Sequence, residues 1–343
     1  MKMLQWRQIL QWRQILQWRQ ILQWRQMLQW RQMLQWRRTV LPILWLVPIS
    51  VMLWFHVQDM SQQRRALEMR QVQTERKEMI KSACSEEELL QISSFSLKHL
   101  IVDDDHGLLY CYVPKVATTH WKGFMLSLKQ GEPYADPTSK SLRNVHDKSR
   151  FRTLDMLPKT EIKAKLMHYT KFFFVSDPFN RLISAFQNKF EQPKELIYAK
   201  YGKHILQHYN NESNLPQTAV EAFESGKRVS FNNFIQFLLD PKTKQPFDPH
   251  WRQIQQLCHP CQIQYDFIGL QETLDEDAEQ LLSILKLTKD FKFPHAYKNM
   301  TSSDSVLQWF SQVPLNDRKK LFMLYKKDFK LFGYRRPDEL LDG

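Results

Sequence analysis

The chain has 343 residues, of which 43% are hydrophobic, so it is long enough to bury one large core or two smaller ones. Its formal net charge is +13, but Lys2 and seven arginines, with no acid, place +8 of this within residues 1–38. The remainder is only mildly basic, which excludes a polycationic chain and suits acidic ligands without requiring nucleic acid.

Residues 1–38 form an N-terminal tail with a six-residue repeat. QWRQ begins at residues 5, 11, 17, 23 and 29, QWRR begins at 35, and IL or ML joins the units. A six-residue step turns a helix by about 240°, so the tryptophans fall on three stripes rather than on one apolar face. This pattern argues against a coiled coil. Recent expansion of a short unit and a segment that binds the membrane surface both stay open.

An apolar stretch without Asp, Glu, Lys or Arg follows, from Val40 to Val57, and is about long enough to span a bilayer. Arginines crowd its N-terminal side, so the positive-inside rule places the tail in the cytosol and the rest in the lumen. We therefore predict a type II transmembrane signal-anchor at residues 39–57 and a polar luminal stem at residues 58–96. A cleaved signal peptide is the alternative, although a small-residue cleavage site is missing.

The predicted luminal location determines how cysteines and two asparagines are interpreted. The four cysteines are an even number on the oxidising side of the membrane, which favours disulfides in one of three pairings. They are Cys84, Cys111, Cys258 and Cys261. Zinc at the Cys258–Cys261 pair is the alternative, but the chain has no second ligand pair of matching spacing. Asn211 and Asn299 each begin a glycosylation sequon.

A globular pattern extends from residue 97 to residue 343. Buried strands are predicted at Leu108–Val113, Lys171–Val175 and Tyr265–Gly269. Helices are predicted at Phe231–Leu239, from Asp275 onward, and at Asp317–Phe332 before Gly333. Strands that alternate with helices indicate an α/β domain with a mainly parallel sheet covered on both faces.

Two segments of this domain join an apolar strand to a turn that opens a helix, at Tyr110–Gly123 and at Phe172–Phe190. In this arrangement backbone N–H groups and the positive end of the helix face an anion. The first turn also carries Lys115, directly after the rigid Pro114. Two such turns in one domain predict a site for a nucleotide with two phosphate-bearing positions, and hence a nucleotide-dependent transferase.

Several long segments resemble the Golgi carbohydrate sulfotransferases, in particular the chondroitin/dermatan 4-O-sulfotransferase branch. They are PKVATTHWKG, VSDPFNRLISAFQNKF, HWRQIQQLCHPCQIQYDFIGLQETLDEDAEQLL and LYKKDFKLFGY. The resemblance implies a luminal Golgi enzyme with a three-layer α/β sulfotransferase fold, similar to P-loop kinases, around a central parallel sheet. It implies 3′-phosphoadenosine 5′-phosphosulfate, PAPS, as the donor, a glycosaminoglycan as the acceptor, most simply at the 4-OH of GalNAc, and no metal.

The resemblance also assigns residues to the donor site. Its first motif, which would wrap the 5′-phosphosulfate, falls on Pro114, Lys115, Val116, Ala117, Thr118, Thr119 and His120. Its second motif, which would hold the 3′-phosphate, falls on Ser176, Asp177, Pro178, Phe179, Asn180, Arg181, Leu182, Ile183 and Ser184. Lys115 is the expected catalytic cation, because a positive charge can neutralise the oxygen that leaves with the donor. Thr118 and Thr119 would add hydroxyl donors.

The family's second motif usually begins with arginine, and this sequence has Ser176 at that position. Losing a charge-assisted contact costs about 1.5–3 kcal/mol, or roughly ten- to a hundred-fold in donor affinity. An inactive homologue that binds glycosaminoglycan or a partner enzyme is therefore the alternative function. A P-loop kinase is a further rival, but the chain lacks GxxxxGK[ST].

The acceptor hydroxyl must lose a proton to a base. Several histidines are available, and we assign His146 as the expected catalytic base because it follows the first motif. His250, beside Trp251, stays open as another candidate.

Overall fold

The computed structural model describes residues 2–85, 94–139, 144–210, 212–243, 246–293 and 303–342, with side chains left undescribed for 2–23, 26, 32, 34–49, 94–96, 148 and 303. Its contacts divide the chain into two compact units, Met1–Glu68 and Met69–Gly343. Each unit is described by itself. The predicted glycosylation sites Asn211 and Asn299 lie outside the described residues.

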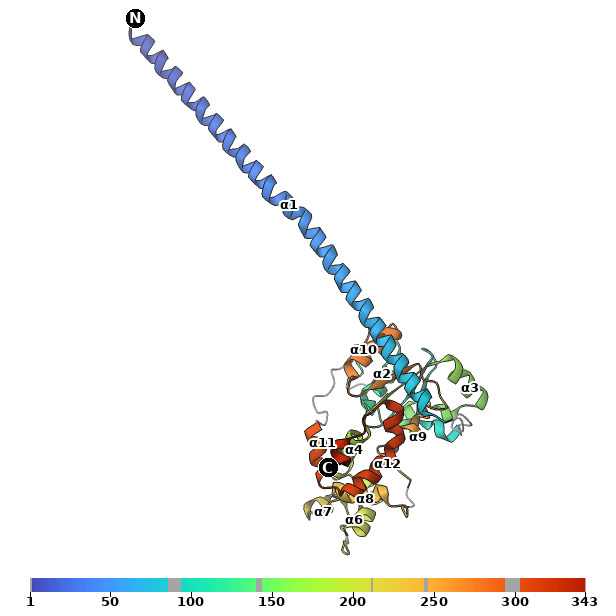
Figure 1. The fold of residues 1–343 in the computed structure, drawn as a ribbon. Coiled ribbons are helices and arrows are strands. Elements are labelled where there is room, and N and C mark those ends of the chain that lie inside the picture. Colours follow the sequence, from blue (N-terminus) through green and yellow to red (C-terminus); the bar gives the residue numbers. More distant parts are fainter. Residues whose placement is uncertain are drawn as a thin grey trace. The chain divides into compact units, whose positions relative to one another are not determined.

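The first unit consists of the N-terminal part of helix α1, which runs from Lys2 to Ala83 (Figure 1). The repeat is therefore helical, and its described side chains Trp24 and Trp30 are more than 60% exposed. Among the helices with described residues, none is long and apolar enough to span a membrane. That finding covers only part of the predicted signal-anchor at 39–57, because the side chains of residues 39–49 are not described.

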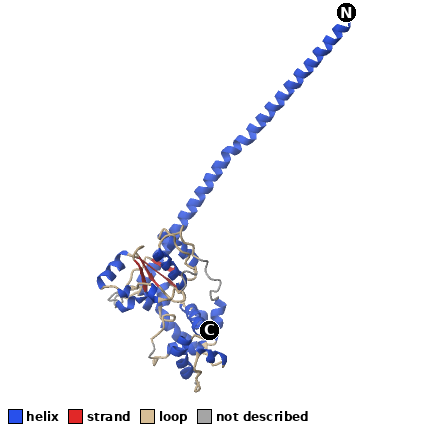
Figure 2. Cartoon of the chain, turned by 180° about the vertical axis from the view of Figure 1, so that it is seen from behind, coloured by secondary structure: helices blue, strands red, loops and turns tan. Residues whose placement is uncertain are grey.

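The second unit is built on a four-stranded sheet with the order β1-β2-β3-β4. The strands are β1 (Leu100–Asp103), β2 (Leu108–Cys111), β3 (Thr170–Val175) and β4 (Phe267–Leu270). β1 and β2 form an antiparallel hairpin, whereas β2, β3 and β4 are parallel. Figure 2 shows these strands enclosed by helices. The predicted α/β class with a mainly parallel central sheet is confirmed, and β1 is a strand that the sequence pattern did not predict.

The central strand β3 explains why a run of three phenylalanines lies beside a glycine. Phe172, Phe173 and Phe174 are at most 1% exposed, as expected for a strand covered on both faces. Phe174 pairs with Gly269 of β4, and a Cβ on Gly269 would lie 2.1 Å from the Phe174 ring. The glycine in YDFIG is therefore required by the bulk of its neighbour on β3.

Helices cover the sheet and extend the domain. The longer ones are α2 (Thr118–Gln130), α3 (Lys159–His168), α4 (Pro178–Phe190), α6 (Lys203–Tyr209), α8 (Phe231–Leu239), α10 (Leu274–Ile284), α11 (Ser303–Ser311) and α12 (Leu315–Phe332). The short ones are α5 (Glu195–Ile197), α7 (Ala219–Glu224), α9 (Ile254–Cys258), α13 (Asp338–Leu341), η2 (Ser94–His99), η4 (Lys148–Arg150), η5 (Leu154–Met156) and η6 (Tyr198–Gly202). The predicted helix at Phe231–Leu239 is confirmed with the same bounds. α12 ends at Gly333, whose φ of 73° suits a C-terminal glycine.

The C-terminal end of α1 belongs to this unit and covers the edge strand β4. The side-chain amide of Gln73 donates to the Ile268 carbonyl and accepts from the Ile268 N–H, both at 2.9 Å. Arg76 forms a 2.8 Å ion pair with the fully buried Asp277. Gln73 therefore substitutes for a fifth strand at one position, and part of the predicted stem is integral to the domain.

Two disulfides join the four cysteines. Cys84, just after α1, pairs with Cys261, and Cys111 of β2 pairs with Cys258 of α9. The prediction of disulfides is confirmed and the pairing is resolved. The zinc alternative at Cys258 and Cys261 is wrong, because both thiols are used in disulfides.

Candidate active site

A cavity of about 1670 Å³ opens at the carboxyl ends of the three parallel strands. Pro114 follows β2, Ser176 follows β3, and Gln271 follows β4, and all three line the cavity. Ligands of open α/β sheets bind at this edge, where loops from several strands meet. The structure therefore brings the two predicted motifs to one site.

The loop after β2 has a backbone of unusual shape. Lys115 and Ala117 have φ angles of 76° and 45°, in the left-handed region that residues other than glycine seldom adopt. Strain of this kind is found at ligand sites, where the surrounding structure stabilises it. Lys115 is half-buried, and its pKa is lowered to about 8 because burial penalises its charge and because Lys189 and Lys194 repel it.

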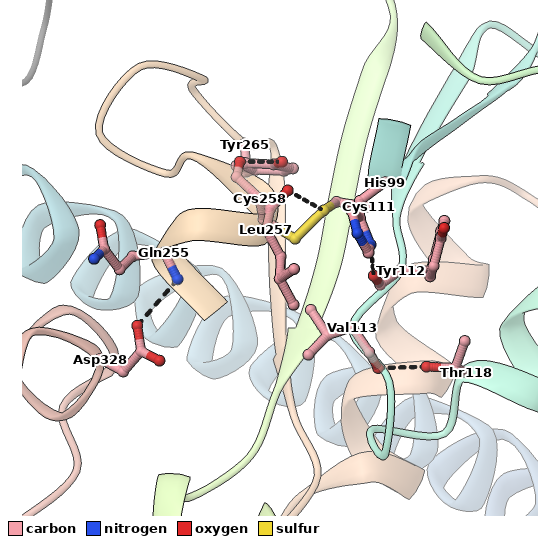
Figure 3. Close-up of a disulfide and its surroundings, with 10 residues drawn as sticks. All are labelled: His99, Cys111, Tyr112, Val113, Thr118, Gln255, Leu257, Cys258, Tyr265 and Asp328. Carbon is pink, nitrogen blue, oxygen red and sulfur yellow. Dashed lines mark hydrogen bonds between the residues drawn. A yellow bond between two sulfur atoms is a disulfide. The ribbon is translucent and has the colours of Figure 1, made fainter. Parts of the chain in front are cut away.

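The remaining residues of the first motif divide into cavity-lining and structural groups. Thr119 and His120 line the cavity, whereas Val116 is fully buried in the core. The Thr118 hydroxyl donates back to the Val113 carbonyl and closes the loop (Figure 3). We expected Thr118 to offer its hydroxyl to a ligand, but in the structure that group is used within the loop.

The second motif begins α4 with a self-contained cap. The Asp177 carboxylate accepts from the N–H groups of Phe179 and Asn180, both at 2.9 Å, and Pro178 occupies the first helical turn. Burial raises the pKa of Asp177 to about 6, with a further contribution from Glu272. We expected the start of this helix to face a bound anion, but the anion at those N–H groups is Asp177 itself.

One face of α4 lines the cavity and the other packs into the core. Ser176, Asn180 and Ser184 line the cavity. Phe179, Leu182 and Ile183 are at most 1% exposed and belong to the core. Of the second motif, the polar side chains on one helical face are therefore the ones available to a ligand.

Arg181 is buried and is oriented toward the protein backbone. Its guanidinium donates to the carbonyl oxygens of Pro114 at 3.1 Å, Arg252 at 2.7 Å and Pro249 at 2.6 Å. These three bonds join the loop after β2 to the segment that precedes α9. We expected Arg181 to belong to the 3′-phosphate site, but its donors connect two loops that line the cavity.

The charges around the cavity are predominantly positive. Six lysines and two arginines line it, against the three carboxylates Asp155, Asp248 and Glu272. Lys189, at the end of α4, and Lys194, just after it, lie close enough to lower the pKa of Lys115. Cations that crowd one another in this way are arranged for a ligand with several negative charges.

Two histidines line the same cavity in different settings. The Nε2 atom of His146 lies 3.3 Å from the Thr119 hydroxyl, and burial together with Lys122, Lys189 and Lys115 lowers the pKa of His146. The Nδ1 atom of His250 lies 2.5 Å from the Asp248 carboxylate. The structure thus places both candidate bases at the cavity, and the sequence analysis did not identify Asp248 as the partner of His250.

The chain is similar to known proteins over most of its length. A model described as "Sulfotransferase family" matches residues 98–335, more than half of the chain. Carbohydrate sulfotransferase 12 of Mus musculus is 46% identical over 292 residues, which cover 78% of this chain and 70% of the mouse protein. The Xenopus laevis protein of the same name is 48% identical over 265 residues, covering 73% and 63%. Carbohydrate sulfotransferase 11 of Mus musculus is 38% identical over 248 residues, covering 71% and 69%. No solved structure matches.

The chain therefore belongs to the sulfotransferase family. The resemblance to the carbohydrate sulfotransferases that the motifs carried is confirmed, and these relatives do not favour a non-catalytic homologue. The aligned segment spans between 63% and 70% of the length of these three relatives.

Several cavity residues, among them Lys189, Lys194 and Asp248, were not identified by the sequence analysis. Lys189 and Lys194 lie beyond the second motif, and no local spacing links them to Lys115. Asp248 had a usable signal, because an aspartate two residues before His250 can bond the following backbone and side chain.

Proposed function

We propose that this enzyme transfers the sulfuryl group of PAPS to a carbohydrate hydroxyl, the 4-OH of GalNAc in chondroitin or dermatan. The observation that carries the proposal is the cation-rich cavity at the carboxyl ends of β2, β3 and β4, with Lys115 in its strained loop. The names of the relatives support a carbohydrate acceptor. The acceptor sugar and its position rest on the resemblance of the motifs.

The residues fit a donor with charges at two ends. When bound, PAPS supplies the sulfuryl group, and its 5′-phosphate leaves with the oxygen that had bridged phosphorus and sulfur. The loop from Pro114 to His120 would hold the 5′ end, and Lys115 would neutralise the charge that develops there. The side chains of Asn180 and Ser184 would hold the 3′ end, with Ser176 beside them.

In this proposal, two lysines replace the positive charge that an arginine at position 176 would bring. Ser176 is 5% exposed and brings no charge to the cavity, while Arg181 is committed to backbone carbonyls. Lys189, at the end of α4, and Lys194, just after that helix, would then supply the positive charge. A lysine is a point charge without the two-pronged geometry of arginine, so donor binding would be weaker than with an arginine at 176.

We further propose that the enzyme works in the Golgi lumen as a single-pass type II membrane protein. The basic tail at 1–38, the apolar stretch at 39–57 and the two disulfides support this arrangement. Glycosylation at Asn211 and Asn299 would accompany it. Cleavage of glycans from the full chain by an endoglycosidase, read as a shift in gel mobility, tests the luminal placement.

Transfer of labelled sulfate from PAPS to desulfated chondroitin by the full chain tests the function. Disaccharide analysis of the product should show sulfate at the 4 position of GalNAc. Folded protein that transfers no sulfate to chondroitin, dermatan or terminal GalNAc, and binds no adenosine 3′,5′-bisphosphate, would contradict the proposal.

A further inference from the structure

The segment that carries His250 is fixed at both ends. On one side, the carbonyls of Pro249 and Arg252 accept from Arg181. On the other, Cys258 of α9 is joined by a disulfide to Cys111 of β2, as Figure 3 shows. The N–H groups at the start of α9 also bond Asp328 of α12. His250 therefore lies in a segment held in place rather than in a loose loop.

The same guanidinium joins the backbone that precedes His250 to the backbone that precedes the catalytic lysine. Arg181 donates to the carbonyl of Pro114, which directly precedes Lys115, and to the carbonyl of Pro249, which directly precedes His250. Because one guanidinium donates to both carbonyls, the backbone segments that carry Lys115 and His250 lie next to each other. Both line the cavity.

The imidazole of His250 is oriented for proton acceptance. Its Nδ1 lies 2.5 Å from Oδ1 of Asp248, and the same oxygen accepts from the His250 backbone N–H at 3.0 Å. An ionised carboxylate is an acceptor, so Nδ1 carries the proton and Nε2 of the neutral ring is the acceptor. A base whose second nitrogen is held by a carboxylate is the arrangement found in hydrolytic triads.

We propose, resting on the function above, that His250 is the general base of this sulfotransferase and that Asp248 and Arg181 are its positioning residues. Nε2 of His250 takes the proton of the acceptor hydroxyl while that oxygen forms a bond to sulfur. The bond between sulfur and the bridging oxygen breaks, and its electron pair stays on the oxygen of the departing adenosine 3′,5′-bisphosphate. Lys115 neutralises that oxygen, and Asp248 stabilises the imidazolium.

His146 has a different place in this scheme. Its Nε2 faces the Thr119 hydroxyl at the start of α2, and Lys115 and Lys122 are among its charged neighbours. No carboxylate contributes to its pKa, which burial and the lysines lower. We therefore assign His146 to donor binding beside the loop from Pro114 to His120. Its loss should raise the KM for PAPS more than it lowers kcat.

Turnover of three asparagine variants in the full chain tests the assignment. His250→Asn should lower kcat by about 10²–10⁴-fold and leave the affinity for adenosine 3′,5′-bisphosphate within about two-fold. His146→Asn should keep kcat within about ten-fold. His208→Asn, an exposed residue of α6 outside the cavity, should match the wild type. His250→Asn with more than a tenth of the wild-type kcat would overturn the proposal, as would a greater loss of kcat in His146→Asn.

A pH profile separates a chemical role from a structural one and needs no His250 variant to fold. Burial lowers the pKa of His250, Asp248 raises it, and Lys189 and Arg181 lower it. The net effect is a lowered pKa, so the wild-type kcat/KM should fall on the acid side, at a pH below the ordinary range of histidine, where the ring becomes protonated. Asp248→Asn should move this limb to lower pH, whereas a limb that does not move would place the base elsewhere.

Rescue by added imidazole also separates a chemical role of His250 from a structural one. His250→Gly should regain part of its lost turnover with added imidazole, and a nucleotide-binding His250→Gly that imidazole does not activate would overturn the assignment. A wild-type chain that transfers no sulfate would instead contradict the proposed function. A wild type that transfers sulfate, beside a fully active His250→Asn, would contradict this inference alone.

Discussion

The Nε atom of Arg181 lies 3.1 Å from the carbonyl oxygen of Pro114, so a residue of the second motif holds the first motif in place. The two remaining bonds of the guanidinium reach Pro249 and Arg252. The loop from Pro114 to His120, helix α4 and the segment before α9 are therefore joined around the cavity. A change in any of these bonds should affect both stability and turnover.

Replacing Arg181 with methionine should leave three carbonyls without their donor. Each buried unsatisfied group costs about 1–3 kcal/mol, so the free energy of unfolding should fall by several kcal/mol and kcat should fall with it. Thermal denaturation and turnover of Arg181→Met and Arg181→Lys measure this. If either variant kept wild-type stability and lost only donor affinity, Arg181 would instead bind the 3′-phosphate.

Ser176→Arg should tighten donor binding. An arginine at this cavity-lining position adds the charge-assisted contact whose absence costs about 1.5–3 kcal/mol, so the Kd for adenosine 3′,5′-bisphosphate should fall ten- to a hundred-fold. Calorimetry of the variant beside Ser225→Arg, an exposed position just after α7, separates a local contact from general charge. Equal effects in the two variants would contradict the placement of Ser176 at the donor.

The basic limb of the pH profile should report Lys115. The charged amine is needed, and its pKa in the free enzyme is lowered to about 8, so kcat/KM should fall as the pH rises through about 8. Lys189→Met removes a repelling charge and should move this limb to higher pH, while weakening donor binding. Lys163→Met, on the exposed face of α3, should move neither. A basic limb that stays in place in Lys189→Met would contradict the proximity of these lysines.

The two disulfides should differ in their effect on turnover. Alanine at Cys111 and Cys258 frees the segment of His250 from β2, so stability should fall by about 2–5 kcal/mol and kcat should fall as well. Alanine at Cys84 and Cys261 frees the end of α1, so stability should fall while kcat is kept. Thermal denaturation and turnover of both pairs compare them. A greater loss of kcat in the second pair would contradict the positioning role of the first.

The contact of α1 with β4 should define the folded domain. Gln73→Ala removes the acceptor of the Ile268 N–H, while the Ile268 carbonyl still accepts from Arg76 at 2.7 Å, and should cost about 1–3 kcal/mol. A fragment that begins at Met69 should therefore be more stable toward urea than one that begins at residue 97. Equal urea midpoints would contradict the contribution of α1.

Local signals predicted the parts of this fold that depend on neighbours in the sequence. The strands β2 and β3, the helix at Phe231–Leu239 and the two strand-to-helix turns follow from apolar runs and helix-start residues. The strand β1 escaped because Asp103 and the acids after it resemble a solvated turn. In the structure Asp103 ends β1, and its carboxylate caps the hairpin by accepting from Asp105 and His106.

Contacts between residues far apart in the chain could not be predicted from local sequence patterns. The partners of Arg181 lie 67 to 71 residues away, and the cysteine pairs are separated by 147 and 177 residues. Arg181 was predicted to bind a ligand because it is a charged residue of the second motif. In the structure its guanidinium instead donates to three backbone carbonyls that only the fold brings together. The sequence thus predicted that the two motifs lie close together, but it could not predict which of their side chains line the cavity and which bond other loops.

The most direct measurement of the central claim is the turnover of Lys115→Met with PAPS and desulfated chondroitin, beside its affinity for adenosine 3′,5′-bisphosphate. Removing a charge aimed at the leaving oxygen should lower kcat about 10²–10³-fold, and the bound product nucleotide would show that the site is folded. Full turnover in Lys115→Met would contradict the assignment of this cavity as the site of sulfuryl transfer.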